Sequence, residues 1–135
     1  MKLLFSLFAD AAKIDPDGCI SMLHGGWDVY TVTGFPFIVR QMFLVLRIEF
    51  EAAECGRIHA LSISPLGPKG NLIAPVGDVQ INVPKVKLRG SGKNNYTCVG
   101  DLGGVTFHEP GDYVFSFSIG KTKLGQAVLA IVHQS

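Results

Sequence analysis

The sequence lacks the features that would connect it to nucleic acid or to a membrane. Only 17% of its 135 residues are charged, against about 25% in an average soluble protein. Twelve basic and eleven acidic residues leave a net charge of +1, so the basic excess typical of nucleic-acid binders is missing. No stretch reaches the ~18 apolar residues that a membrane-spanning helix requires. We therefore expect a soluble protein without a nucleic-acid or membrane partner.

Cysteine is scarce and widely spaced. The three residues, Cys19, Cys55 and Cys98, are odd in number, and no two lie at the short spacing of a zinc knuckle or a redox motif. We expect three reduced thiols, mostly buried as small apolar side chains. Reduced thiols fit a reducing compartment, which favours a cytoplasmic location.

Known catalytic and ligand-binding motifs are missing too. The segment Gly90–Lys93 resembles a phosphate loop, but Lys87 replaces its first glycine and Asn94 its Ser/Thr. No Gly-x-Ser-x-Gly elbow occurs, and the four histidines are scattered, so no pair of metal ligands is predicted on one element. We predict no metal, no cofactor and no catalytic residue, and the pattern favours a protein that is not an enzyme.

The residues that are present indicate strands. Sixteen glycines and seven prolines separate runs rich in Val, Ile, Phe and Tyr, the composition typical of strands. The turn Asp15–Gly18 separates the first two of these runs. Predicted strands cover residues 3–9, 19–23, 28–32, 37–51, 57–64, a weaker pair within 71–88, and a hairpin of 113–119 with 121–132.

The C-terminal hairpin carries the most specific fold signal. The order Gly111-x-Tyr113-x-Phe115 resembles the start of the sixth strand in immunoglobulin-like sandwiches, where the tyrosine hydroxyl bonds back to the preceding corner. Phe115 would occupy the place of the immunoglobulin cysteine. We predict one all-β domain over residues 1–135, a two-sheet antiparallel β-sandwich of seven to nine strands, immunoglobulin-like or jelly-roll-like. A small closed barrel is the alternative.

A basic strand is the clearest candidate for a binding site. Lys85, Lys87 and Arg89 recur at every second residue, and Lys93 follows shortly after. On a strand the first three would project from one face at about 6.6 Å intervals and could bind a phosphorylated ligand or an acidic partner. The alternative is an edge strand whose charges prevent unwanted pairing.

Apolar segments suggest self-association. Residues 3–8, 42–46 and 127–132 are apolar on both faces of their predicted strands, whereas the outer face of a sandwich strand is usually polar. Our leading hypothesis is a non-enzymatic interaction module that forms a homo-oligomer, in the first instance a dimer, with a further protein partner as an option. The alternatives are a small-molecule or nucleotide-binding protein that uses the basic strand, and a structural component of a phage or secretion assembly.

Five short segments along the chain form a recognisable set. They are Lys2–Phe5 with Ala9-Asp10, Gly26–Asp28, Phe35-Pro36, Glu54–Gly56, and Pro110–Tyr113 with Leu124-Gly125. Together they resemble a family of small uncharacterised bacterial proteins known only as a domain of unknown function. The resemblance covers nearly the whole chain and implies a bacterial or phage origin and a compact β-sandwich. It implies no activity, cofactor or catalytic residue.

Overall fold

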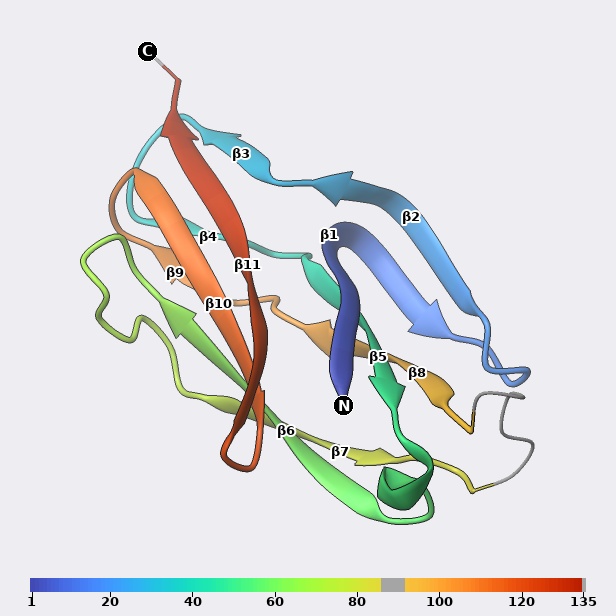
Figure 1. Cartoon of the computed structure of the whole chain (residues 1–135). Helices are drawn as coiled ribbons and strands as arrows, with labels where there is room; N and C mark the ends of the chain where they lie inside the picture. The colour runs from blue at the N-terminus through green and yellow to red at the C-terminus, as the bar shows by residue number, and fades with distance from the viewer. Residues whose placement is uncertain (86–91, 135) are drawn as a thin grey trace.

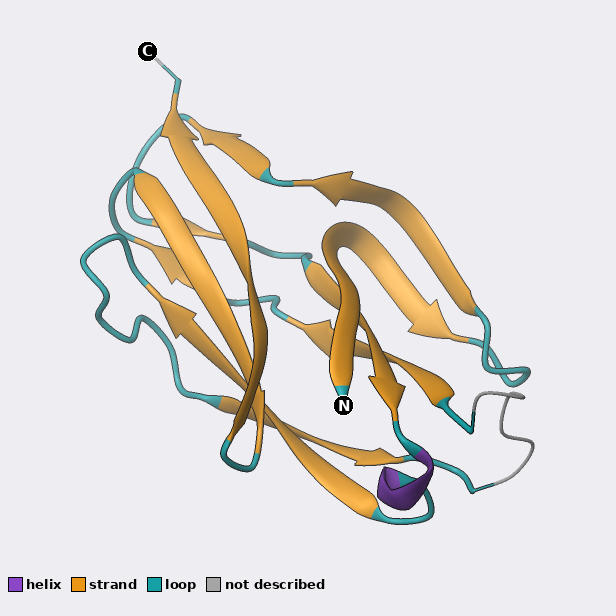
Figure 2. Cartoon of the chain, viewed as in Figure 1, coloured by secondary structure: helices purple, strands orange, loops and turns teal. Residues whose placement is uncertain are grey.

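The computed structural model describes residues 1–85 and 92–134, and these fold into strands with one short 3₁₀ turn, η1 (Ala52–Glu54) (Figures 1 and 2). No helix in this described part is long and apolar enough to cross a membrane. The strands are β1 (Lys2–Ile14), β2 (Ile20–Trp27), β3 (Val29–Val32), β4 (Phe37–Ile38), β5 (Phe43–Phe50), β6 (Ile58–Leu66), β7 (Gly77–Asn82), β8 (Asn94–Asp101), β9 (Thr106–Phe107), β10 (Gly111–Ile119) and β11 (Thr122–His133).

The strands form two large sheets and one small one. The first sheet has the order β2-β1-β5-β8, the second β3-β11-β10-β6-β7, and β4 pairs with β9. All neighbours are antiparallel except β11 and β3, which run parallel. The prediction of an all-β chain is confirmed. The described residues form eleven strands, more than the predicted seven to nine, and the β3–β11 pair departs from a purely antiparallel arrangement.

Alternation in the sequence explains which face of each strand is buried. On β5, Leu44, Leu46 and Ile48 are buried in the core, while the intervening Arg47 and Glu49 are half-exposed on the opposite face. Period two is the repeat of a strand with one face in the core. The strand β10 repeats this pattern with aromatic residues.

One core joins the two large sheets. Phe8 of β1 meets Phe115 of β10 edge to face, with ring centroids 5.4 Å apart. Both rings are almost fully buried, and residues from β5, β6, β7 and β11 complete the same cluster. An aromatic pair of this kind contributes about 0.5–1.5 kcal/mol beyond the apolar area that it buries, so this contact helps to hold the two sheets together.

The predicted tyrosine corner is present. The Tyr113 hydroxyl donates a hydrogen bond to the Glu109 carbonyl oxygen at 2.6 Å and accepts one from the Glu109 N–H at 3.4 Å. The Tyr113 ring packs edge to face on Phe107, with centroids 4.8 Å apart. The corner therefore ties the loop before β10 to the core, and Phe115 is buried as predicted.

Several strand boundaries differ from the sequence prediction. The predicted strand 37–51 is two strands, because the chain leaves the extended ladder between Ile38 and Phe43 while still burying Val39 and Met42. The strands β8 and β9 were not predicted. Polar residues dominate the start of β8, which is held by a continuous antiparallel register with β5. Such a strand is defined by its pairing with a neighbouring strand, and the alternation of residues along the sequence does not indicate that pairing.

Candidate functional site

The predicted basic strand lies largely outside the described residues. Lys87 and Arg89 fall in the segment 86–91, so their part of the prediction stays a prediction. Within the described part, β7 ends at Asn82, and the exposed Lys85 follows it outside the strand. The Lys85 methylenes pass close to Gly56, where an added Cβ would lie 3.2 Å from Lys85 Cδ.

Lys93 contacts carboxylates. Its Nζ lies 3.6 Å from Glu49 Oε1 and 3.6 Å from Glu51 Oε1. Glu49 lies on the solvent-facing side of β5 and Glu51 directly follows the strand, so one ammonium group bridges both. These exposed pairs contribute at most about 1 kcal/mol each, but they offset the positive charge that an anionic ligand would meet at Lys93.

The histidines form no metal site in the part of the chain that the structure describes, where no three His, Cys, Asp or Glu side chains come together. His59 lies on β6, between β10 and β7, and its ring contacts the backbone. Its Nε2 lies 2.7 Å from the Glu54 carbonyl oxygen, and its ring stacks on Phe50 at 5.1 Å. This imidazole therefore has a structural role.

The three cysteines are free thiols in different environments. Cys55 and Cys98 are buried, as expected, whereas Cys19 is exposed. Burial raises the pKa of the Cys98 thiol to about 12, so this thiol remains protonated and unreactive near neutral pH. Buried thiols of this kind act as small apolar side chains.

The first large sheet carries an apolar strip on the face turned away from the core. Cross-strand register places Leu7, Val45 and Val99 side by side on β1, β5 and β8. Val45 is fully buried yet is not part of the core cluster. Next to this row, Phe5 and Phe43 occupy the same face, and Phe5 is exposed. The predicted apolar character of residues 3–8 and 42–46 thus produces an outward apolar strip.

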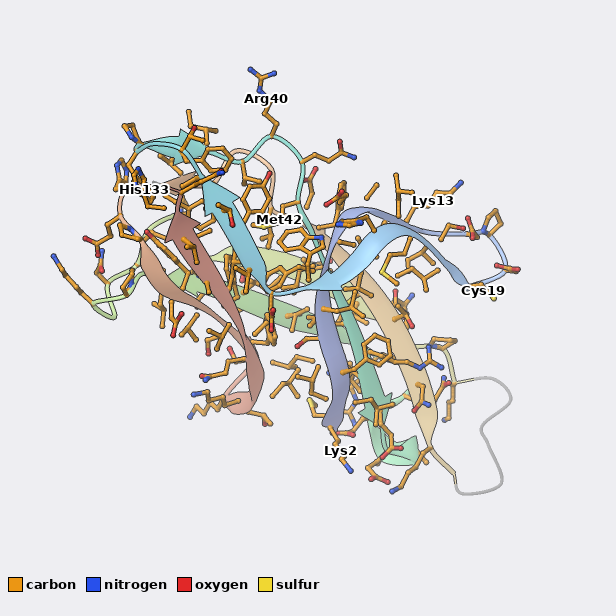
Figure 3. The ribbon with its side chains drawn as sticks, turned by 90° about the horizontal axis from the view of Figure 1, so that it is seen from above. Lys2, Lys13, Cys19, Arg40, Met42 and His133 are labelled. Carbon is orange, nitrogen blue, oxygen red and sulfur yellow. The ribbon has the colours of Figure 1, made fainter. Side chains whose placement is uncertain are left out.

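The first hairpin extends beyond that sheet. β1 pairs with β5 only as far as Ala9, and from Ala11 onward its only partner is β2. We call residues 11–23 the hairpin arm. Lys13 and Cys19 lie towards its far end, away from the body of the molecule (Figure 3). The sequence predicted separate strands at 3–9 and 19–23, and it missed the arm because Asp10–Lys13 has no alternating pattern.

Polar contacts order the tip of the arm. The backbone turns at Gly18, whose φ is 84°, and the Gly18 N–H donates to the Asp15 carbonyl oxygen at 2.9 Å. The Ser21 hydroxyl donates to the Asp15 carboxylate, and Lys13 Nζ lies 3.5 Å from it. The hydrogen bond from Ser21, helped by Lys13, lowers the Asp15 pKa. The predicted turn is therefore present and closes the hairpin.

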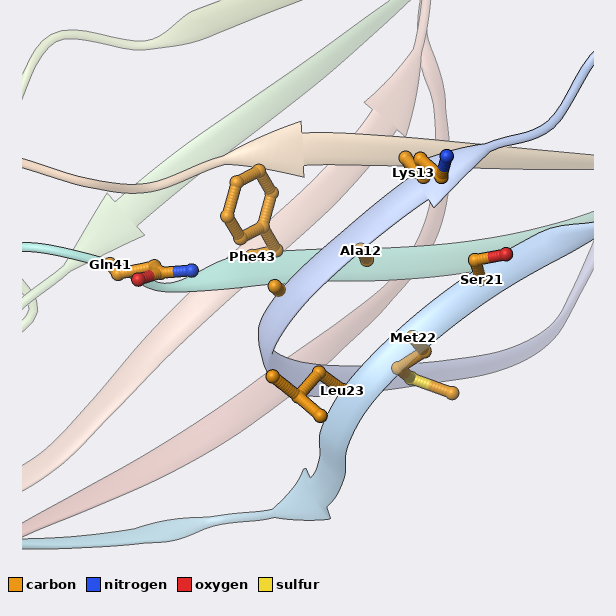
Figure 4. Close-up of a pocket in the computed structure, with 8 residues that line it drawn as sticks. Ala12, Lys13, Ser21, Met22, Leu23, Gln41 and Phe43 are labelled. Atoms are coloured by element: carbon orange, nitrogen blue, oxygen red, sulfur yellow. The ribbon is translucent and has the colours of Figure 1, made fainter.

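A shallow apolar hollow lies between the arm and the sheet. It has a volume of about 360 Å³. Figure 4 shows the second half of β1 crossing over β5, with Phe43 beside it and Leu23 and Met22 on the adjoining strand. Apart from Lys13, Ser21 and Gln41, its lining is apolar. Such a surface offers van der Waals contact to another apolar surface, and it contains no group placed for catalysis.

The chain belongs to a family of unknown function (DUF6941), whose model matches residues 4–132. This confirms the resemblance seen in the sequence. No curated protein matches the chain. The family supplies no activity.

Proposed function

We propose that this protein is a non-enzymatic interaction module that self-associates as a dimer through its hairpin arm. The observation that carries the proposal is the two-stranded ribbon beyond Ala9, on which Ile14, Met22 and Leu23 are exposed. A lone two-stranded ribbon is marginally stable in water and usually packs on another surface. The proposal places a second copy of the chain on that surface.

Exposed apolar area on the arm provides a driving force. Leu23 is 66% exposed and Met22 is 43% exposed, the former being the most exposed large apolar side chain among the described residues. Covering the exposed part of such a side chain contributes about 1–2 kcal/mol. The hollow between Phe43 and the arm adjoins this surface and adds further apolar area to the same interface.

The first half of the β2 edge, residues 20–23, lies before the bulge at Gly26 and lacks the usual protection against pairing. The eight residues of β2 include no proline and no Asp, Glu, Lys or Arg, and the six between Ile20 and Trp27 are exposed. By comparison, the edge strands β7 and β8 carry Asp78 and Asp101. Charged or proline residues are a common means of blocking edge-to-edge pairing, and residues 20–23 of β2 have neither. The edge strand β3 is also uncharged, but it has only four residues.

A second copy fits this edge by symmetry. Antiparallel pairing of two identical strands has a twofold axis, so the contact closes on itself as a dimer. The net charge of +1 gives little repulsion between copies. The paired arms would extend the first sheet across the dimer. The two large sheets bury one core between them and act as the two layers of an immunoglobulin-like sandwich. The three free thiols fit a cytoplasmic location.

Sedimentation equilibrium of matched variants tests the proposal. Leu23→Lys places a charge on the arm, while Ile58→Lys changes a side chain of similar exposure, 63%, at the start of β6. We expect the wild type and Ile58→Lys to be dimers at micromolar concentration, and Leu23→Lys to be a folded monomer whose melting temperature, unlike theirs, does not depend on protein concentration. A wild type that stays monomeric at several hundred micromolar contradicts the proposal, as does equal dissociation of both variants. Open-ended polymers would instead favour the assembly-component alternative.

The basic-strand alternative has its own test. If Lys87 and Arg89 bind a phosphorylated ligand, reversing both charges should abolish binding of that ligand without changing the melting temperature. Among the described members of the predicted set, Lys93 is already paired with Glu49 and Glu51. We therefore place this function second to self-association.

A further inference from the structure

We propose that a groove beside the bend of β1 binds a small organic cation of the substituted ammonium type. The groove consists of two adjoining hollows of about 390 and 330 Å³, and both are lined by Asp10 and Tyr30. Trp27 lines one hollow and Phe37 the other. Volumes of this order are at the lower end of those of small-molecule sites. Met22 and Leu23, which carry the proposed dimer contact, do not line the groove, although Gln41 lines both the groove and the hollow beside the arm.

Three aromatic rings form one wall of the groove. Tyr30 lies 5.6 Å from Trp27 at an interplanar angle of 66°, and 5.4 Å from Phe37 at 41°. All three side chains are half-buried and pack against the core on their inner side. Tyr30 lines both hollows, and Trp27 and Phe37 line one hollow each, so both hollows are bordered by aromatic side chains. The π-face of an aromatic ring carries partial negative charge and attracts cations.

The Trp27 indole is held by a hydrogen bond to a backbone segment with positive φ angles. His24 has a φ of 49°, the only positive value for a residue other than glycine in the described part of the chain. Its carbonyl oxygen accepts a hydrogen bond from Trp27 Nε1 at 2.9 Å. Gly26, with a φ of 94°, is the extra residue of a bulge opposite Phe8 and Ala9. Bulges and left-handed residues commonly aim side chains at functional sites.

The carboxylate of Asp10 supplies the negative charge. Asp10 is half-buried, and within the described residues it has neither an ion pair nor a side-chain hydrogen bond. By contrast, Asp15, on the same hairpin, is held by Ser21 and Lys13. A carboxylate that shares a wall with aromatic rings favours a cationic ligand, because the ligand offsets the carboxylate charge while its alkyl groups cover the rings.

Arg40 allows a test of the sign of the ligand charge. It lines the hollow that contains Phe37, but its side chain extends away from the protein into solvent (Figure 3). If the ligand is a cation, removal of this like charge should strengthen binding. If the ligand is an anion or a sugar that uses the guanidinium as a donor, the same removal should weaken binding.

Isothermal titration calorimetry with choline, supported by emission from Trp27, the only tryptophan, tests the proposal. The neutral carbon isostere 3,3-dimethyl-1-butanol is the matched control. We expect saturable choline binding, with the isostere, Asp10→Asn and Tyr30→Leu each at least about tenfold weaker. Arg40→Gln should tighten binding about twofold, and Leu23→Lys should leave it unchanged even as a monomer. A peptide with a trimethyllysine is tested as a second ligand. Tighter binding of the peptide than of choline would identify the ligand as a methylated lysine side chain of a protein.

Four results would overturn the proposal. The first is the absence of saturable heat and emission change with choline or the peptide up to about 10 mM. The second is equal binding of the isostere, which would show an unspecific apolar contact. The third is weaker binding by Arg40→Gln, and the fourth is binding of a neutral sugar in place of choline. Melting temperatures of the variants close to that of the wild type show that any loss concerns the groove and not the fold.

Discussion

The substitution Tyr113→Phe measures how strongly the corner before β10 holds the fold together. It removes only the hydroxyl, which donates to the Glu109 carbonyl oxygen at 2.6 Å and accepts from the Glu109 N–H at 3.4 Å. The ring remains and keeps its contact with Phe107. The shorter hydrogen bond contributes about 0.5–1.5 kcal/mol, and a half-buried carbonyl left without a partner adds to the loss. We expect the free energy of unfolding to fall by about 1–2 kcal/mol and the melting temperature by about 5 °C.

Urea unfolding is the assay, with Tyr96→Phe as the matched control. Tyr96 packs against the core as a half-buried ring, and its hydroxyl forms no side-chain hydrogen bond within the described residues. We expect Tyr96→Phe to change the free energy of unfolding by less than about 0.5 kcal/mol. The reasoning is refuted if Tyr113→Phe stays within that limit, or if both substitutions cost the same.

The remaining predictions concern single side chains and backbone positions. Alkylation of the native protein should modify the exposed Cys19 and spare Cys98, because burial raises the pKa of the Cys98 thiol to about 12. Cys55 is buried as well, so mass spectrometry should find one modified thiol before unfolding and three after it. Burial works to raise the Glu54 pKa, but a backbone hydrogen bond and the terminal ammonium group together lower it from 4.5. Glu54 should therefore stabilise the fold above pH 4.5, and the stability difference from Glu54→Gln should disappear as the pH falls through the lowered value. Gly111→Ala should destabilise the protein by more than about 1 kcal/mol, because φ at Gly111 is 139° and the new Cβ would lie 2.7 Å from a Pro68 carbon. The control Gly77→Ala, whose Cβ would enter open space, should lower the melting temperature less.

The sequence was informative where a strand buries one face against the core. The alternation of β10 and the position of Tyr113 near its start predicted both the C-terminal hairpin and the hydrogen bond of Tyr113, because both follow from local pattern. The second half of β5 was predicted for the same reason. In these segments, residue type and position repeat with the strand period, and no long-range information is needed.

The sequence was uninformative where pairing partners change. β1 leaves β5 at Ala9 and continues with β2 alone, and this switch depends on where two distant strands end. The start of β8 is polar, so only its register with β5 makes it a strand. The groove combines Asp10, Tyr30 and Phe37 from three strands, and no spacing along the chain indicates their proximity. Such arrangements are set by tertiary structure.

Amide hydrogen exchange at two protein concentrations tests the proposed arm-to-arm contact most directly. In a dimer built on β2, amides of residues 20–23 at its free edge gain hydrogen-bond partners, so their exchange should slow as the concentration rises from about 1 to 500 µM. The edge strand β7, which carries Asp78, serves as the internal control and should exchange at the same rate at both concentrations. Exchange in residues 20–23 that does not depend on concentration, or equal slowing in β7, would contradict self-association through the arm.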